Sequence, residues 1–299
     1  MISIPGTLSV YNPQTRLTMF ESGPETSTTS VIFLGGLLDG YHAVPYLPML
    51  GRALAERGMS LIQVMLSSSN IGYGTSSLLQ DTQELDILFA FLREERAKTR
   101  LFVIGHSTGC QQIIFHSHHG QHKSAVQGII LQGPVSDREF MVSSLDMYGK
   151  YLRLAQRMIL DGKGQELMVR EVDSAPITAY RFNSLASVGG DDDMFSSDLT
   201  FETMRMIYSH IRAPALWLHC GSDEYVPSHV DKQKLMAQMA AASPTTLATV
   251  QLPEADHAVS DPASQMLLCQ AVLEFVGRVM SDLDTFENRQ EASFHGLSL

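Results

Sequence analysis

The segment that most constrains the fold is Gly105-His106-Ser107-Thr108-Gly109, which follows an apolar run at 101–104 and precedes a stretch with helical spacing. A strand that turns this abruptly into a helix leaves no room for side chains beside the turn, so glycine is needed on both flanks. The serine between them is held in a strained backbone with its hydroxyl in open space. A Ser107 that only capped a helix would be expected after polar residues, which are not found here. The sequence therefore predicts that Ser107 is a nucleophile.

A serine hydroxyl becomes nucleophilic at neutral pH when a base accepts its proton and a carboxylate orients that base. The strand-like run 213–220 leads into a turn-rich loop that carries Asp223, and the run 246–252 leads into a loop that carries His257. Asp256 is a second candidate for the acid, but neighbouring side chains on a loop tend to diverge. We therefore expect Ser107, Asp223 and His257 to form a catalytic triad at the carboxyl ends of three strands.

Acyl transfer also needs hydrogen-bond donors for the developing oxyanion. The glycine-rich loop 35–40 follows the strand-like run 31–34, and we predict that the backbone N–H groups of Leu37 and Thr108 are these donors. The glycines before Leu37 would allow close backbone approach, and Gly36 is also a candidate substrate contact. A phosphate-binding loop is excluded because no Gly-Lys-Ser or Gly-Lys-Thr follows.

Strand-like and helix-like runs alternate through most of the chain, beginning with strands expected at 2–10 and 15–21. This alternation predicts an α/β fold with a mostly parallel central sheet and helices on both faces. The alternation stops between Ser136 and Thr200, where helical spacing dominates. We expect a core domain of residues 1–135 and 201–299 and an inserted helical cap of residues 136–200 over the catalytic mouth. The end of the chain, from about Ser281, is expected to be a short helical remnant and a loose tail.

Three consecutive carboxylates, Asp191, Asp192 and Asp193, follow two glycines inside the expected cap. They are interpreted either as a solvated loop tip or as substrate contacts that attract a cation or close against the core. Four histidines cluster after the serine segment, at 116, 118, 119 and 122, but no cysteine or carboxylate joins them at ligand spacing. We predict no metal and no cofactor.

The 299-residue chain has a net charge of −11 and a pI near 5.4, which argues against nucleic-acid or anionic-membrane partners. No apolar run approaches eighteen residues and no secretory leader is recognisable, so an intracellular, cytoplasmic protein is expected. Cys110, Cys220 and Cys269 are scattered in expected core elements and predict buried, reduced thiols. The oligomeric state is not indicated.

Several segments outside the serine motif carry a family resemblance. They are 66–69, 72–78, 134–139, 189–195 and 223–227. Together with 105–109, they resemble the fungal α/β-hydrolase family that includes an intracellular siderophore esterase acting on fusarinine-type, ester-linked hydroxamates. The resemblance covers nearly the whole chain and implies the α/β-hydrolase fold and hydrolysis of a small-molecule ester. It places Ser107, Asp223 and His257 at the nucleophile, acid and base positions.

The resemblance implies ester hydrolysis more firmly than it implies a substrate. A lactone or polyketide ester of fungal secondary metabolism is an alternative substrate. An acyltransferase, a lyase or a cyclase would use the same fold, and so would a ligand-binding protein that retains the triad without turnover.

Overall fold

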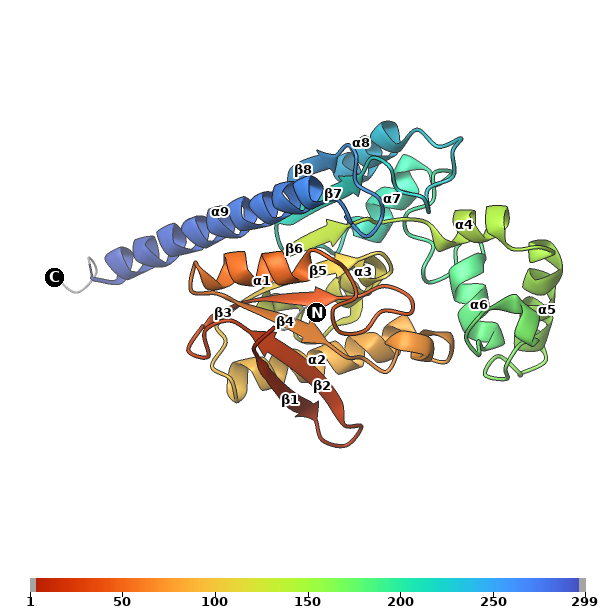
Figure 1. Ribbon diagram of the computed structural model, residues 1–299, viewed down its shortest axis with the longest axis horizontal. Helices are drawn as coiled ribbons and strands as arrows, with labels where there is room; N and C mark the ends of the chain where they lie inside the picture. Colours follow the sequence, from red (N-terminus) through yellow and green to blue (C-terminus); the bar gives the residue numbers. More distant parts are fainter. Residues whose placement is uncertain (1–3, 296–299) are drawn as a thin grey trace.

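The computed structural model describes residues 4–295, and an eight-stranded sheet forms the centre of this part of the chain (Figure 1). The strand order is β1-β2-β4-β3-β5-β6-β7-β8. Strand β2 runs antiparallel to β1 and β4, and every other neighbouring pair is parallel. The strands are β1 (Thr7–Asn12), β2 (Leu17–Ser22), β3 (Thr29–Leu34), β4 (Ser60–Val64), β5 (Arg100–His106), β6 (Val126–Gln132), β7 (Ala215–Cys220) and β8 (Thr246–Leu252). The predicted mostly parallel sheet and α/β-hydrolase fold are confirmed.

Helices cover both faces of this sheet because both faces are apolar. In β5, Leu101 and Val103 pack into one hydrophobic cluster, whereas Phe102 and Ile104 pack into another on the opposite face. One face is covered by α2 (Leu78–Glu94), α3 (Gly109–His119), α7 (Phe201–Tyr208) and α8 (Lys232–Ala242). The other is covered by α1 (Leu47–Ala55) and α9 (Pro262–His295).

Side-chain caps fix where several of these helices begin. The Ser77 hydroxyl accepts a hydrogen bond from the Gln80 N–H at the start of α2, and Asp231 accepts one from the Lys234 N–H at the start of α8. Each cap satisfies a backbone donor that the first helical turn leaves without a partner.

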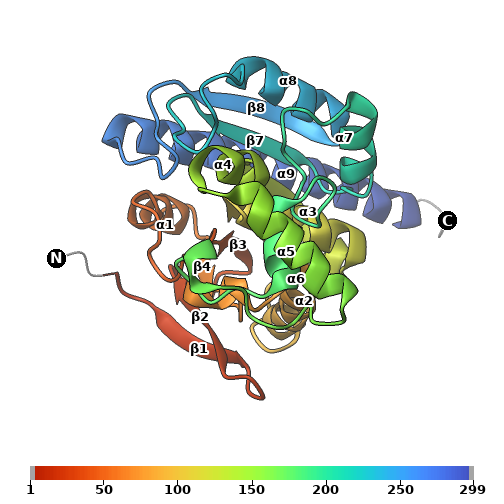
Figure 2. The same ribbon diagram turned by 90° about the vertical axis from the view of Figure 1, so that its right-hand side faces the viewer.

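Between β6 and α7 the chain forms α4 (Asp137–Ser144), α5 (Tyr148–Leu160) and α6 (Ala179–Ala186), which stand beyond the carboxyl ends of the parallel strands (Figures 1 and 2). They have a hydrophobic cluster of their own, which includes Ala155, Phe182 and Leu185. Residues 136–200 contribute no strand to the sheet; the β-structure described there is one isolated bridge between Leu167 and Thr178. The division into a core and an inserted cap remains a prediction.

The carboxyl-terminal prediction differs most from the structure. Helix α9 runs without a break to His295, well past Ser281, and Arg100 forms an ion pair with Asp284 on it. The apolar spacing ends near Leu283, but the polar residues that follow are mostly good helix formers and need no buried face to continue the helix. The last four residues of the expected tail lie outside the described part.

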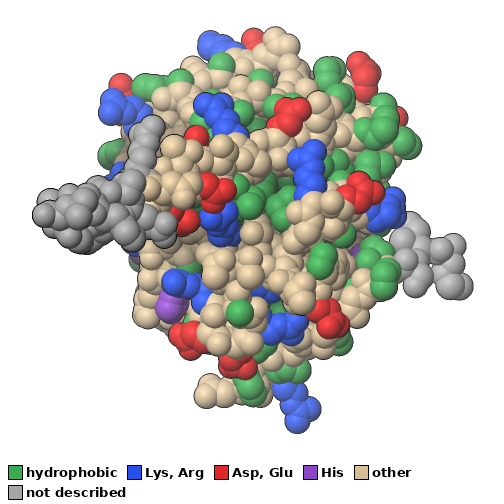
Figure 3. Space-filling model, turned by 90° about the vertical axis from the view of Figure 1, so that its left-hand side faces the viewer, with side chains coloured by type: hydrophobic (Ala, Val, Ile, Leu, Met, Phe, Trp, Pro, Cys, Tyr) green, Lys and Arg blue, Asp and Glu red, His purple; other side chains and the backbone are tan. Residues whose placement is uncertain are grey.

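The surface of the described part is mixed in charge. On the face shown in Figure 3, acidic and basic side chains are interspersed, and hydrophobic side chains reach the surface in small groups. No described helix is both long and apolar enough to cross a membrane.

Candidate active site

The turn between β5 and α3 holds Ser107 in the left-handed backbone region, with φ of 55°. A Cβ on Gly105 would lie 2.5 Å from the backbone of Gly109, and a Cβ on Gly109 would lie 2.4 Å from the Leu34 carbonyl oxygen. Neither contact is possible for a real side chain, so both glycines are required by the close passage of neighbouring backbone. The Ser107 N–H donates to the Gln132 carbonyl at 3.0 Å, which fixes the turn against β6. Ser107 thus has the strained conformation that the sequence predicts.

Asp223 and His257 meet at the carboxyl ends of β7 and β8. The His257 Nδ1 and the Asp223 Oδ2 are 2.8 Å apart, and both side chains are buried. A carboxylate can only accept, so Nδ1 carries the proton and Nε2 is left as an acceptor. The Asp223 Oδ1 accepts from the Tyr225 N–H at 3.0 Å, which holds the carboxylate in place. Asp256, the second candidate for the acid, instead accepts from the Ser260 N–H at 2.7 Å.

Two further contacts hold the backbone of His257. Its N–H donates to the Glu224 carboxylate at 2.9 Å, and its carbonyl accepts from the Gln132 amide at 3.1 Å. Gly133 leaves space beside the imidazole: its φ is +59°, and a Cβ there would lie 3.2 Å from ring atoms of His257. The imidazole is therefore fixed by its own loop, by the preceding loop and by the end of β6.

His106 occupies the space beside His257, with ring centroids 4.7 Å apart. Its Nδ1 lies 2.6 Å from the Gln132 side-chain oxygen, which can only accept, so His106 donates from Nδ1. Burial lowers the pKa of His106 to about 3. His106 is therefore neutral near pH 7 and places no second positive charge beside His257.

The loop after β3 brings its backbone against Ser107. A Cβ on Gly36 would lie 2.7 Å from the Ser107 Cβ and 3.1 Å from its hydroxyl oxygen. The Gly36 N–H donates to the Asp39 Oδ2 at 2.7 Å, and the Asp39 N–H donates back to the Gly36 carbonyl at 3.2 Å. Burial raises the pKa of Asp39, an effect that the bond from Gly36 partly opposes. The N–H groups of Leu37 and Thr108 have no acceptor within the described residues.

Ser107 and His257 line the same cavity, which has a volume of about 520 Å³. Within the described part of the chain the Ser107 hydroxyl makes no hydrogen bond, so the structure joins Asp223 to His257 and places Ser107 beside them without a bond to the imidazole. Leu37 and Gly36 also line this cavity, whereas Thr108 is buried just behind Ser107.

The cavity wall carries acidic and aromatic groups. Its carboxyl side chains are Asp39, Asp137, Asp173 and Glu224, and its lining contains no Lys or Arg among the described residues. Burial raises the pKa of Asp137 to about 7. Aromatic rings lie near the imidazole, because Tyr225 is 4.6 Å from His257 and 4.9 Å from Phe140, measured between ring centroids. Such a wall disfavours negatively charged substrates.

The structure does not bring Asp191, Asp192 or Asp193 to this cavity. Asp192 is buried and bonded to Arg181 at 2.5 Å, and Asp193 is buried and bonded to Arg138 at 3.0 Å. The solvated-tip interpretation is therefore wrong for these two, which close the loop against internal arginines. The third, Asp191, accepts from the Tyr180 hydroxyl at 2.5 Å.

One histidine of the cluster after the serine segment has a carboxylate partner in the folded chain. His116 is buried and bonded to Asp86 at 3.0 Å, a carboxylate from α2 that sequence spacing does not reveal. In the described part of the chain no group of three or more His, Cys, Asp or Glu is arranged to hold a metal ion. Cys110, Cys220 and Cys269 are buried free thiols, as predicted.

Sequence reasoning missed Gln132, Glu224 and Asp39, which position the backbone around Ser107 and His257. His106 and Gln132 are paired residues at the last positions of adjacent strands. Their place at the carboxyl end of the sheet is a signal that the sequence does contain, because sites in such sheets lie at this edge.

Comparison with known proteins places these features in a family. The model of a family described as "Protein of unknown function (DUF1749)" matches residues 1–277. A fusarinine C esterase of Aspergillus fumigatus is 28% identical over 79% of this chain and 82% of its own length. An esterase of Emericella nidulans is also 28% identical, over 78% of this chain and 79% of its own. The structure of a siderophore hydrolase, EstB from Aspergillus fumigatus, superposes with a TM-score of 0.78 at 26% identity and covers 93% of this chain and 98% of that one.

Proposed function

Because this chain belongs to the DUF1749 family and resembles fungal esterases along most of its length, we propose that it is a serine esterase of small metabolites. The observation that carries the proposal is the 2.8 Å bond between Asp223 and His257, whose imidazole lines the same cavity as the strained Ser107. The bond to Asp223 leaves Nε2 of His257 free to act as a base, and a base beside the serine is what nucleophilic catalysis requires. The resemblance noted from the sequence motifs agrees with the esterase names of the relatives.

In the proposed mechanism, the free Nε2 of His257 accepts the Ser107 proton as the serine oxygen attacks the ester carbonyl. Asp223 holds the imidazole in the required tautomer and stabilises it when it is charged. The N–H groups of Leu37 and Thr108 donate to the oxyanion, and His257 then protonates the departing alcohol. Water repeats the sequence on the acyl-enzyme and releases the acid.

The unpaired state of two amides supports the choice of oxyanion donors. In the loop after β3, Asp39 takes up the N–H of Gly36, whereas the next amide, that of Leu37, has no acceptor in the described chain. The same holds for Thr108 at the start of α3, where helix amides point toward the amino-terminal end. Gly36 thereby acts through close approach to Ser107 and not through its own amide.

We further propose that residues 136–200 act as a cap that selects the substrate. Phe140 and Met141 of α4 and the segment Val172–Ser174 contribute to the cavity wall, so the substrate would contact residues from both parts of the chain. The activities for which two relatives are named favour an ester-linked siderophore as substrate. The cavity wall supports a neutral or cationic ester over an anionic one. Reduced, buried cysteines support a cytoplasmic site of action.

The test compares purified wild type with Ser107→Ala on three ester groups: ester-linked hydroxamates, lactones and short chromogenic acyl esters, with products identified by mass. Turnover should fall by a factor of about 10⁴ to 10⁶. The matched control is Ser143→Ala, an exposed serine on α4 that does not line the cavity. Turnover that survives Ser107→Ala in folded protein would refute the nucleophile. Products joined to an added alcohol or amine would identify a transferase instead.

A further inference from the structure

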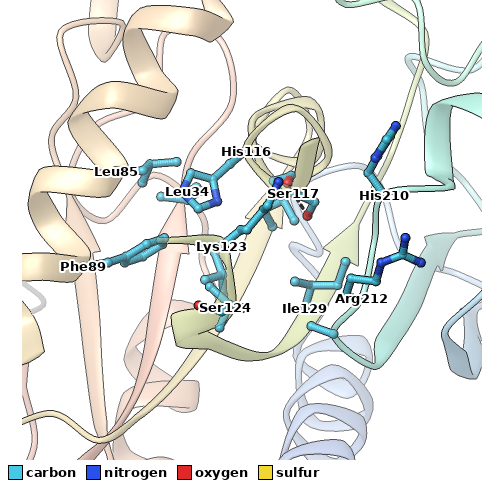
Figure 4. Close-up of a pocket in the computed structure, with 14 residues that line it drawn as sticks. Leu34, Leu85, Phe89, His116, Ser117, Lys123, Ser124, Ile129, His210 and Arg212 are labelled. Atoms are coloured by element: carbon cyan, nitrogen blue, oxygen red, sulfur yellow. Dashed lines mark hydrogen bonds between the residues drawn. The ribbon is translucent and has the colours of Figure 1, made fainter. Parts of the chain in front are cut away.

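A second cavity lies between the sheet and helices α2 and α3, with a volume of about 200 Å³ (Figure 4). In Figure 4, Leu85 and Phe89 extend from α2 on one side and Ile129 stands on the sheet opposite. The remaining apolar wall is made by Leu34, Val103, Ile113, Val126 and Ala213. An apolar cavity of about 150 Å³ is large enough to bind benzene. This cavity therefore has room for one aromatic ring or a short alkyl chain.

The mouth of the second cavity lies at the edge of the sheet opposite Ser107. Lys123 and Ser124 precede β6, and His210 and Arg212 precede β7, so all four belong to the amino ends of parallel strands. Ser107 follows the carboxyl end of β5. The two cavities share no lining residue among those described. The second cavity is thus separate from the proposed catalytic cavity.

The charge of this mouth is opposite to that of the protein as a whole. The chain carries a net charge of −11, yet the described lining contains Lys123, Arg212, His116 and His210 and no Asp or Glu. Lys123 and Arg212 are exposed, and neither forms an ion pair within the described residues. The Lys123 ammonium donates to the His118 carbonyl at 2.8 Å, which holds it near the rim.

Asp86 contacts the lining residue His116, and this acid is already bonded. Asp86 accepts from His116 at 3.0 Å and from the N–H groups of Gln121 and His122 at 2.9 and 2.8 Å. Its charge is therefore compensated by donors behind the cavity wall. The two exposed cations at the rim have no such compensation and are available to an anion.

From the apolar interior and the uncompensated cationic rim, we propose that this cavity binds a small amphipathic monocarboxylate. The ring or alkyl chain fills the space between Phe89 and Ile129, and the carboxylate lies at the rim with Lys123 and Arg212. An ammonium in place of the carboxylate would face two like charges. A neutral hydroxyl in place of the carboxylate would not form charge-assisted hydrogen bonds with Lys123 and Arg212.

Titration calorimetry with 3-phenylpropanoate tests the proposal, with 3-phenylpropan-1-ol and 3-phenylpropylamine as matched neutral and cationic probes. The carboxylate should bind saturably at one site, at least tenfold more tightly than either analogue. In the double variant Lys123→Gln, Arg212→Gln, its affinity should fall at least tenfold, a factor that corresponds to about 1.4 kcal/mol. Both positions are exposed, so folding should be preserved. Arg278→Gln removes an exposed charge from α9 and should leave the affinity unchanged.

Val126→Phe provides a second test, because it replaces a small side chain of the cavity wall by a phenyl ring, which should fill the cavity and abolish binding. Equal binding of the three probes, or carboxylate binding unchanged in the double variant, would overturn the proposal. The absence of saturable binding in the millimolar range would do the same. Each result is independent of esterase activity, since none of these positions lines the cavity of Ser107.

Discussion

Replacement of Gly36 by alanine adds one methyl group at the point where the loop after β3 meets the candidate nucleophile. The new Cβ would lie 2.7 Å from the Ser107 Cβ, whereas ordinary van der Waals contact begins at 3.4 Å. The two segments must therefore separate by about 0.7 Å to restore ordinary contact. Ser107 has little freedom to move, because Gly105 and Gly109 pack it against neighbouring backbone. The loop that carries Leu37 is expected to move instead.

The size of the effect follows from the role proposed for the Leu37 amide. A shift of about 1 Å in a positioned group costs on the order of 10²-fold in rate, and loss of one oxyanion donor costs about 10² to 10³-fold. We expect kcat for Gly36→Ala to fall by about 10² to 10³-fold, which is about 2.7–4 kcal/mol. The free energy of unfolding should fall by only about 1–3 kcal/mol, the usual cost of one added methyl in a packed site.

The assay is steady-state hydrolysis of a short chromogenic ester, with the thermal midpoint measured on the same samples. Gly40→Ala is the matched control: it makes the same change in the same loop, but its Cβ meets the Asn70 side-chain amide at 2.9 Å, and that side chain can rotate away. Gly40→Ala should keep kcat within a few-fold of wild type. Wild-type kcat in folded Gly36→Ala, or an equal loss in Gly40→Ala, would refute the reasoning.

Four further predictions concern charge and protonation. Asp223→Asn should lower kcat by about 10⁴-fold, measured with the same ester, because the amide favours the wrong tautomer of His257. Anionic esters should show lower kcat/KM than neutral or cationic esters of equal size, because the cavity wall has carboxyl groups and no Lys or Arg among described residues. Burial lowers the pKa of His219 from 6.5 to about 4, so the unfolded chain binds a proton there that the folded chain does not. The contribution of His219 to the free energy of unfolding should therefore fall by up to about 3 kcal/mol as pH decreases from 6.5 to 4. Urea titrations at several pH values should show that the free energy of unfolding of His219→Phe falls less steeply with decreasing pH than that of wild type. Arg181→Leu should lower that free energy by about 3–5 kcal/mol because Asp192 loses its buried partner, whereas Arg157→Leu, which breaks an exposed pair, should cost less than about 1 kcal/mol in the same denaturation assay.

The parts of the candidate site that could be predicted best from the sequence are those that follow from local steric rules. The elbow at Ser107 could be predicted because two flanking glycines after an apolar strand have few other uses. The strand ends that carry Asp223 and His257 could be predicted because apolar runs of strand length stop at turn residues. In both cases the information lies within about ten residues of chain, where spacing determines structure directly.

Contacts between distant segments could not be predicted in this way. Asp193 looks like part of a solvated acidic loop because the sequence does not show that Arg138, 55 residues earlier, pairs with it. The bond from Asp86 to His116 is hidden for the same reason, since α2 and α3 become neighbours only in the folded sheet. In the sequence each of these residues looks like an ordinary polar residue. Only the contact with its partner makes burial of the charged side chain favourable.

The end of β6 explains why the candidate base stays in position although it belongs to a loop. Gln132 bonds through its side-chain oxygen to His106 and through its amide to the His257 carbonyl, while its own backbone carbonyl accepts the Ser107 N–H. One residue at a strand end thus contacts the segments of both the nucleophile and the base. Because β6 lies between β5 and β7 in the sheet, any change in the spacing of these strands would alter both contacts together. The relative placement of Ser107 and His257 is therefore a property of the packed sheet, and loop substitutions that spare Gln132 and Gly133 should disturb it least.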